Sequence, residues 1–101
     1  VMIPAVVVYE IETGIAKSTD PTKRRKQLAE LLDTVAVLPF DVHAARSAAG
    51  IRARLERQGT PIGPMDTLIA GTALAHHATL VTHNTTEFQR IPELQLADWF
   101  T

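Results

Sequence analysis

The sequence predicts an α/β fold with a mainly parallel central sheet. Helical segments alternate along the chain with short apolar segments that are typical of buried strands, and this alternation favours a parallel sheet covered by helices. The chain has 101 residues, which is enough for one compact domain and too few for two. In such folds ligands bind beyond the carboxyl ends of the strands. Residues that follow strands are therefore the first candidates for chemistry.

The first residues predict a short strand followed directly by a helix. Residues 1–3 predict a buried strand, and Pro4 suits the first turn of a helix because its missing N–H costs nothing there. Residues 5–16 are apolar on most faces, which predicts a helix inside the core. The β-branched run at residues 6–8 favours a strand instead. We expect the helix, because Pro4 would fit poorly in a central strand.

A second helix and a second strand are predicted next. Asp20 or Thr19 can cap a helix whose first position is Pro21. Residues 35–40 predict a short strand. Residues 23–32 predict an amphipathic helix with three leucines facing inward: Leu28, Leu31 and Leu32.

The middle of the chain predicts two further helices joined by a constrained loop. Asp41 can cap a helix that runs to about Gln58 and ends at Gly59. Pro64 opens a second helix over residues 65–76, whose many small side chains would let it approach a neighbour closely. The inward face of the first of these helices is predicted from its spacing: Ala44, Ala48, Ile51 and Leu55.

The remaining residues predict two short strands around a loop. Residues 79–82 and 94–99 predict the strands, and residues 83–89 a loop or short helical turn. Trp99 and Phe100 are expected to pack on the core or on a dimer partner.

Composition excludes several classes of site and partner. The chain has no cysteine, so a disulfide framework and thiolate metal sites are excluded, and we expect a cytoplasmic protein. No apolar run approaches the roughly 20 residues that span a bilayer, so no membrane partner is expected. His76 and His77 are adjacent and would diverge on a helix, which argues against zinc. The net charge of -1 means that any nucleic acid must bind through a local patch or through metal ions.

Three positions combine polar side chains with apolar surroundings or strand ends. Glu10 and Asp66 lie in apolar helical segments without a nearby basic residue, and Asn84 follows a predicted strand with Glu87 three residues on. Convergent carboxylates without a cationic partner are what Mg²⁺ binds, and such an ion can activate water against a phosphodiester. The alternative is that Glu10 faces solvent and that Asp66 is simply a first-turn acid beside a helix N-terminus.

Three ordered stretches resemble a known family. Residues 9–14 (YEIETG), 62–70 (IGPMDTLIA) and 80–91 (LVTHNTTEFQRI) are similar to the E-[LI]-x-x-G, I-G-x-x-D-x-x-I-A and L-V-T-x-[ND]-x-x-E-F-x-R-[IV] stretches of VapC-type PIN domains. The resemblance covers essentially the whole chain. It implies a PIN-like α/β/α sandwich around a parallel sheet and a ribonuclease that depends on Mg²⁺ or Mn²⁺. It also implies a toxin held by a cognate antitoxin and a homodimer.

The resemblance also assigns roles to individual residues. Glu10 matches the second acid of the family's cluster, Asp66 the third, and Asn84 the fourth position, which is often aspartate. Thr82 matches a supporting hydroxyl residue. The neutral Asn84 contributes less charge at the fourth position, and the sequence leaves open whether Glu87 compensates for it.

Two departures from the family pattern shape the expected function. The leading acid of the family lies on a first strand that this chain lacks, and the chain starts with Val1 in a way unlike a translation start. The role is not transferred to Asp33, which lies at the end of a predicted helix. We therefore expect a single PIN domain over residues 1–101 that is incomplete at its N-terminus, with the first strand and the following helices missing.

The sequence leaves several functional interpretations open. The first is a metal-dependent endoribonuclease toxin, inactive as this fragment alone, that binds RNA and an antitoxin. The second is a catalytically silent module that holds an antitoxin or RNA, which the neutral Asn84 favours. The third is a stable remnant without a function of its own. The basic run at residues 23–26 either contacts an RNA backbone or forms a solvated helix face.

Overall fold

A computed structural model describes residues 2–82 and 84–97 of the chain. The predictions for Trp99 and Phe100 therefore lie outside the described residues. Its elements follow in the order β1 (Met2–Pro4), α1 (Ala5–Ala16), α2 (Pro21–Leu32), β2 (Ala36–Leu38), α3 (Val42–Arg57), α4 (Pro64–Ala75), β3 (Leu80–Val81), α5 (Thr85–Phe88) and β4 (Leu96–Ala97). The order of helices and strands confirms the predicted α/β class. Among the described residues, no helix is both long and apolar enough to cross a membrane.

The strands pair in parallel, as predicted. Met2 of β1 lies opposite Ala36 of β2, and Leu80 of β3 lies opposite Leu96 of β4. The described strands form two separate pairs rather than one continuous sheet. An apolar pocket of about 260 Å³ lies between β1 and β3 and is lined by both strands.

The predicted helix ends are confirmed in detail. The Asp20 carboxylate caps α2 by accepting a hydrogen bond from the backbone N–H of Lys23 at 3.4 Å. Asp41 caps α3 in the same way through Ala44, at 2.9 Å. Gly59 follows α3 with a φ of 72°, a left-handed conformation that favours glycine.

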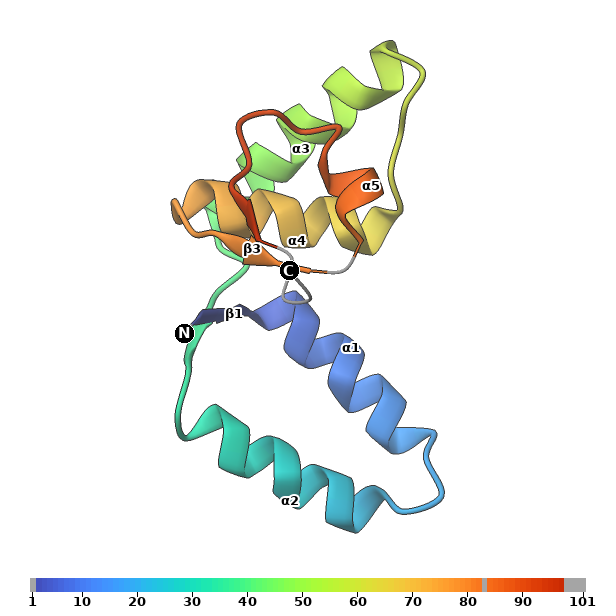
Figure 1. Ribbon diagram of the computed structural model, residues 1–101, viewed down its shortest axis with the longest axis vertical. Coiled ribbons are helices and arrows are strands. Elements are labelled where there is room, and N and C mark those ends of the chain that lie inside the picture. The colour runs from blue at the N-terminus through green and yellow to red at the C-terminus, as the bar shows by residue number, and fades with distance from the viewer. Residues whose placement is uncertain (1, 83, 98–101) are drawn as a thin grey trace.

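Helices α3 and α4 form the centre of the core. The predicted inward face of α3 is buried throughout. At Gly71 of α4, an added Cβ would lie 2.6 Å from the Cβ of Ala48, so the two helices approach more closely than a side chain on Gly71 would allow. We call α3 and α4, with β3, α5 and β4 packed around them, the α3–α4 layer (Figure 1). The close approach confirms the prediction made from the small residues of α4.

Helices α1 and α2 form an antiparallel pair that extends away from this layer (Figure 1), and we call residues 5–32 the α1–α2 hairpin. Two predictions fail here. The helix α1 was expected inside the core, yet Tyr9 is 61% exposed and only Val6 and Ile15 are buried. Leu31 was expected to face inward and is 44% exposed. A helix that is apolar all round does not reveal which face its neighbours cover.

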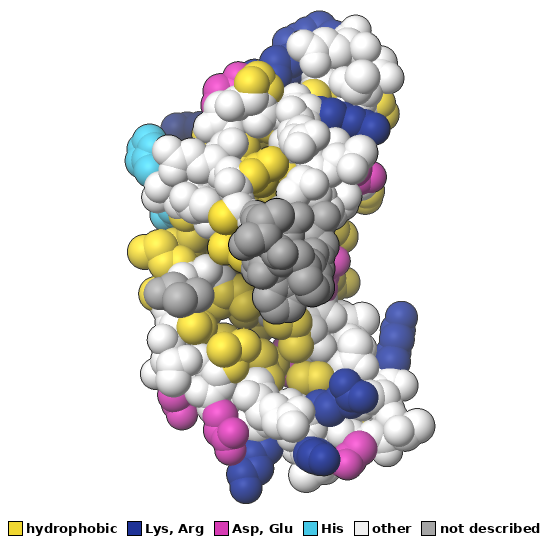
Figure 2. Space-filling model, viewed as in Figure 1, with side chains coloured by type: hydrophobic (Ala, Val, Ile, Leu, Met, Phe, Trp, Pro, Cys, Tyr) yellow, Lys and Arg dark blue, Asp and Glu magenta, His cyan; other side chains and the backbone are white. Residues whose placement is uncertain are grey.

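The predicted burial of the first strand is wrong for Met2, whose side chain is exposed in β1. Hydrophobic side chains gather across the middle of one face of the molecule, between the α3–α4 layer and the α1–α2 hairpin, whereas Lys and Arg side chains lie toward its two ends (Figure 2). Some of the hydrophobic side chains of the chain are therefore exposed to solvent in this structure (Figure 2).

Candidate functional site

Asp66 is fixed by the first turn of α4. Pro64 occupies the first helical position, and Gly63 precedes it. Both the backbone N–H and the side-chain hydroxyl of Thr67 donate to the carbonyl oxygen of Gly63, each at 3.0 Å. These bonds define the start of the helix, and they place the half-buried Asp66 carboxyl group beside α5.

Asn84 joins the two acidic side chains of this region. It follows β3, and its backbone N–H donates to the hydroxyl oxygen of Thr82 at 3.0 Å. Its side-chain Nδ2 donates to Oδ2 of Asp66 at 3.3 Å and to Oε2 of Glu87 at 3.2 Å. Four of the residues singled out in the sequence therefore come together. We call Asp66, Asn84 and Glu87 the acidic cluster.

Burial and neighbouring charges perturb the two carboxyl groups in opposite directions. Burial raises the pKa of Asp66 to about 6, with further contributions from a hydrogen bond to Glu87 and from the charges of Glu87 and Glu10. The same hydrogen bond from Asp66, with another from Asn84, lowers the pKa of Glu87. Asp66 is therefore the carboxyl group of the two that is protonated more readily.

Glu10 does not contact the acidic cluster. It is exposed on α1, and its charge contributes to the raised pKa of Asp66. In the described part of the chain its side chain makes no hydrogen bond or ion pair with Asp66, Asn84 or Glu87. Of the site residues predicted from the sequence, the structure therefore brings Asp66, Asn84 and Glu87 together, whereas Glu10 does not contact them.

The donor set of the cluster fits a hard divalent cation. The acidic cluster offers the two carboxylates of Asp66 and Glu87 and the side-chain amide of Asn84. Within residues 2–82 and 84–97, no three His, Cys, Asp or Glu side chains converge to hold a metal ion. Mg²⁺ is commonly held by one or two carboxylates together with water. Over the same residues, neither Asp66 nor Glu87 forms an ion pair that would compete with such a cation.

Two contributors were not identified from the sequence. Arg90 Nη1 donates to the carbonyl oxygen of Pro61 at 2.8 Å, and the backbone of Gly63 is hydrogen-bonded to Glu87, which helps to lower its pKa. Both contacts join the loop before α4 to α5. Neither contact can be predicted from residue type, because each pairs a side chain with a backbone group whose position depends on the path of the loop.

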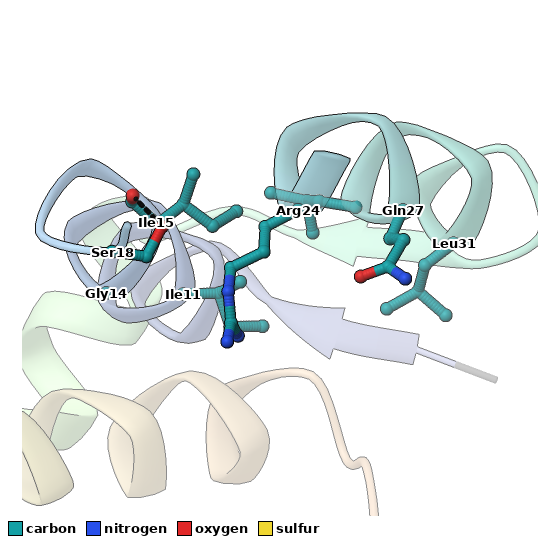
Figure 3. A pocket seen from close by; sticks show the side chains of 8 residues that line it. Ile11, Gly14, Ile15, Ser18, Arg24, Gln27 and Leu31 are labelled. Atoms are coloured by element: carbon teal, nitrogen blue, oxygen red, sulfur yellow. Dashed lines mark hydrogen bonds between the residues drawn. The ribbon is translucent and has the colours of Figure 1, made fainter. Parts of the chain in front are cut away.

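A pocket of about 490 Å³ lies between α1 and α2. Ile11 and Ile15 line it from α1, and Arg24 and Leu31 line it from α2 (Figure 3). Residues 23–26, the basic run, are exposed at the start of α2. Of these residues, Arg25 forms an ion pair of 3.9 Å with Glu12 of α1.

Comparison with known proteins gives a consistent family. The model of the PIN domain family matches residues 1–94. The tRNA(fMet)-specific endonuclease VapC of Salmonella typhimurium is 37% identical over 97 residues, covering 96% of this chain and 74% of that protein. Ribonuclease VapC2 of Rickettsia felis is 35% identical over 99 residues, covering 98% of this chain and 74% of that protein.

Solved structures agree with the sequence relatives. VapBC2 from Rickettsia felis, bound to a DNA fragment from its promoter, has a TM-score of 0.92 at 36% identity and covers 97% of this chain and 74% of that chain. VapBC-1 from nontypeable Haemophilus influenzae has a TM-score of 0.94 at 32% identity and covers 100% of this chain and 75% of that chain. The chain belongs to the PIN domain family, and its relatives within that family are of the VapC type.

Proposed function

We propose that this protein is a metal-dependent endoribonuclease of the VapC toxin type. The observation that carries the proposal is the acidic cluster at the end of β3, where Asn84 bridges Asp66 and Glu87. The ribonuclease names of its relatives support the same reaction class. RNA is the proposed substrate.

Each residue of the acidic cluster would have a separate role in holding the metal ion. Asp66 and Glu87 would hold Mg²⁺ or Mn²⁺ through their carboxylate oxygens, and Asn84 would keep the two groups at a fixed spacing. Thr82 would orient Asn84 through the bond to its backbone N–H. When bound, the cation supplies Lewis acidity and lowers the pKa of a bound water. Glu10 lies near enough to add negative charge to the region.

We further propose that the chain by itself binds metal weakly and has little activity. The argument rests on the cluster, which brings only two carboxylates into contact, while Asn84 is neutral. Fewer anionic ligands give a hard cation less electrostatic stabilisation.

An antitoxin is the proposed protein partner. Several structural neighbours are VapBC proteins, and this chain exposes an apolar pocket between α1 and α2 with Arg24 at its side. An apolar pocket beside a basic side chain would suit an amphipathic segment that carries acidic residues. A homodimer also remains part of this proposal.

The test of the nuclease proposal is Mn²⁺ binding by calorimetry, together with cleavage of single-stranded RNA at high protein concentration. We expect weak binding and slow cleavage, both abolished in Asp66→Asn because a metal ligand is lost. Asp33→Asn is the matched control, since Asp33 is an exposed acid at the end of α2. If the chain neither binds Mn²⁺ nor cleaves RNA yet still binds an antitoxin, the silent binding module becomes the better assignment.

A further inference from the structure

The acidic cluster is assembled from two segments that are distant in the sequence. Asp66 lies in the first turn of α4, whereas Asn84 and Glu87 belong to the segment around α5. The distance between the two carboxyl groups therefore depends on what joins the loop before α4 to α5. The following inference rests on the proposed function, since it concerns how that cluster is held.

Arg90 makes the side-chain contact that joins these segments outside the cluster. Its guanidinium donates to the carbonyl oxygen of Pro61 at 2.8 Å, within the loop that leads into α4. Arg90 stands between Phe88 and Ile91, which are 3% and 1% exposed in the core. These two buried side chains anchor the backbone on either side of the exposed residues Gln89 and Arg90.

We propose that Arg90 is a positioning residue that clamps the loop before α4 against α5 and thereby sets the spacing between Asp66 and Glu87. Its acceptor is a backbone carbonyl oxygen, so the clamp does not consume either carboxylate of the cluster. Loss of the clamp would let the start of α4 move relative to α5. Groups that orient metal ligands without touching the metal commonly change its affinity 10- to 100-fold (roughly) when mutated.

Arg54 of α3 provides a matched control, because its guanidinium group also joins two segments without contacting the acidic cluster. It donates two hydrogen bonds to Glu93, at 2.6 and 2.7 Å, and so joins α3 to the residues after α5. This contact is a bidentate ion pair, which is stronger than a single bond to a carbonyl oxygen. A variant at Arg54 should therefore cost at least as much stability as one at Arg90 without changing the cluster.

The experiment compares wild type, Arg90→Met, Arg90→Lys and Arg54→Met in the full chain. Mn²⁺ affinity is measured by calorimetry, and hydrogen exchange is followed for residues 60–68 without metal. We expect Arg90→Met to weaken Mn²⁺ binding about tenfold and to speed exchange in this segment. Arg90→Lys keeps a donor and should restore part of the affinity. Where RNA cleavage is measurable, Arg90→Met should lower kcat more than it raises KM.

The outcomes separate this inference from the proposed function. If wild type binds Mn²⁺ and Arg90→Met binds it equally well, the role of Arg90 is wrong and the nuclease proposal stands. If Arg54→Met weakens binding as much as Arg90→Met, the effect is general loss of stability and the clamp is again refuted. If wild type itself binds no Mn²⁺, the proposed function fails and this inference fails with it.

Discussion

The α3–α4 layer and the α1–α2 hairpin are both rich in apolar residues, but their helices pack with different closeness. In the layer, Gly71 and Ala48 allow two helix backbones to meet, and the inward face of α3 is buried throughout. In the hairpin, a pocket of about 490 Å³ lies between the helices, and Leu31 stays largely exposed. The α3–α4 layer therefore holds most of the buried core, whereas the α1–α2 hairpin leaves more of its apolar side chains exposed.

The same division runs through the candidate site. The acidic cluster belongs to the layer, where packed residues fix α4 and α5, and Glu10 belongs to the hairpin. A metal site whose ligands must lie at fixed distances is held more precisely by packed elements such as those of the α3–α4 layer. We therefore expect substitutions in the α3–α4 layer to lower the free energy of unfolding more than substitutions of exposed residues in the α1–α2 hairpin.

The largest expected effect is Leu55→Ala in α3. Leu55 is 1% exposed, and truncating a fully buried leucine costs roughly 2–5 kcal/mol because a cavity remains. Leu31→Ala in the hairpin should cost less than about 1 kcal/mol, since that side chain is already exposed. Urea unfolding of both variants measures the difference. Equal losses would show that the hairpin packs as tightly as the layer.

A glycine in each region gives the next comparison. Gly71→Ala places a methyl group within 2.7 Å of the backbone of Ala48, so the helices must separate at a cost of roughly 1–3 kcal/mol. Gly14→Ala in α1 meets no atom within 4 Å and should stabilise that helix by up to about 1 kcal/mol. Thermal unfolding with the two variants in parallel is the measurement. A stable Gly71→Ala protein would contradict the close approach of α3 and α4.

The smallest expected effect is a pH dependence that separates Asp66 from Glu10. The pKa of Asp66 is about 6 in the folded protein and near 3.8 when unfolded, so its contribution to stability is full below about pH 4 and is lost as pH rises through 6. Asp66→Asn stays neutral and can still donate to Glu87. Without metal, it should therefore be more stable than wild type at pH 7.5, by about 1 kcal/mol or less after solvent screening.

The control for this prediction is Glu10→Gln, because Glu10 acts on Asp66 only through its charge. That charge is the smallest of the effects that raise the pKa of Asp66, so the urea midpoint of this variant at pH 7.5 in EDTA should differ from that of wild type by less than that of Asp66→Asn. An Asp66→Asn protein that is no more stable than wild type at pH 7.5 would show that burial of this carboxyl group is not costly.

Where the pattern was one-sided, the sequence predicted the structure well. The face of α3 repeats at helical spacing and is buried as predicted. Asp20 and Asp41 begin their helices, and Gly59 follows the end of α3, through local chemistry. These signals act within a few residues of the chain. Asp66 and Asn84 were singled out by their place at a helix start and after a strand, but their contact joins residues that are 18 positions apart.

The failures concern residues whose environment is set by distant neighbours. The apolar side chains of α1 surround the helix, so the sequence does not specify which of them another element covers, and Tyr9 is exposed. Leu31 of α2 is exposed as well, because no other element of the described residues covers that position. Residue type does not predict the contact of Arg90 either, because its acceptor, the carbonyl oxygen of Pro61, depends on how two loops meet. Tertiary packing, which periodicity does not encode, decides these cases.

The two strand pairs close chain loops of different length. Met2 pairs with Ala36 across the whole hairpin, whereas Leu80 pairs with Leu96 across α5 alone. The first loop is roughly twice as long, and each doubling costs about 0.6 kcal/mol of closure entropy. During refolding we therefore expect β3 and β4 to meet first. The region that carries Asn84 and Glu87 would then fold before β1 pairs with β2.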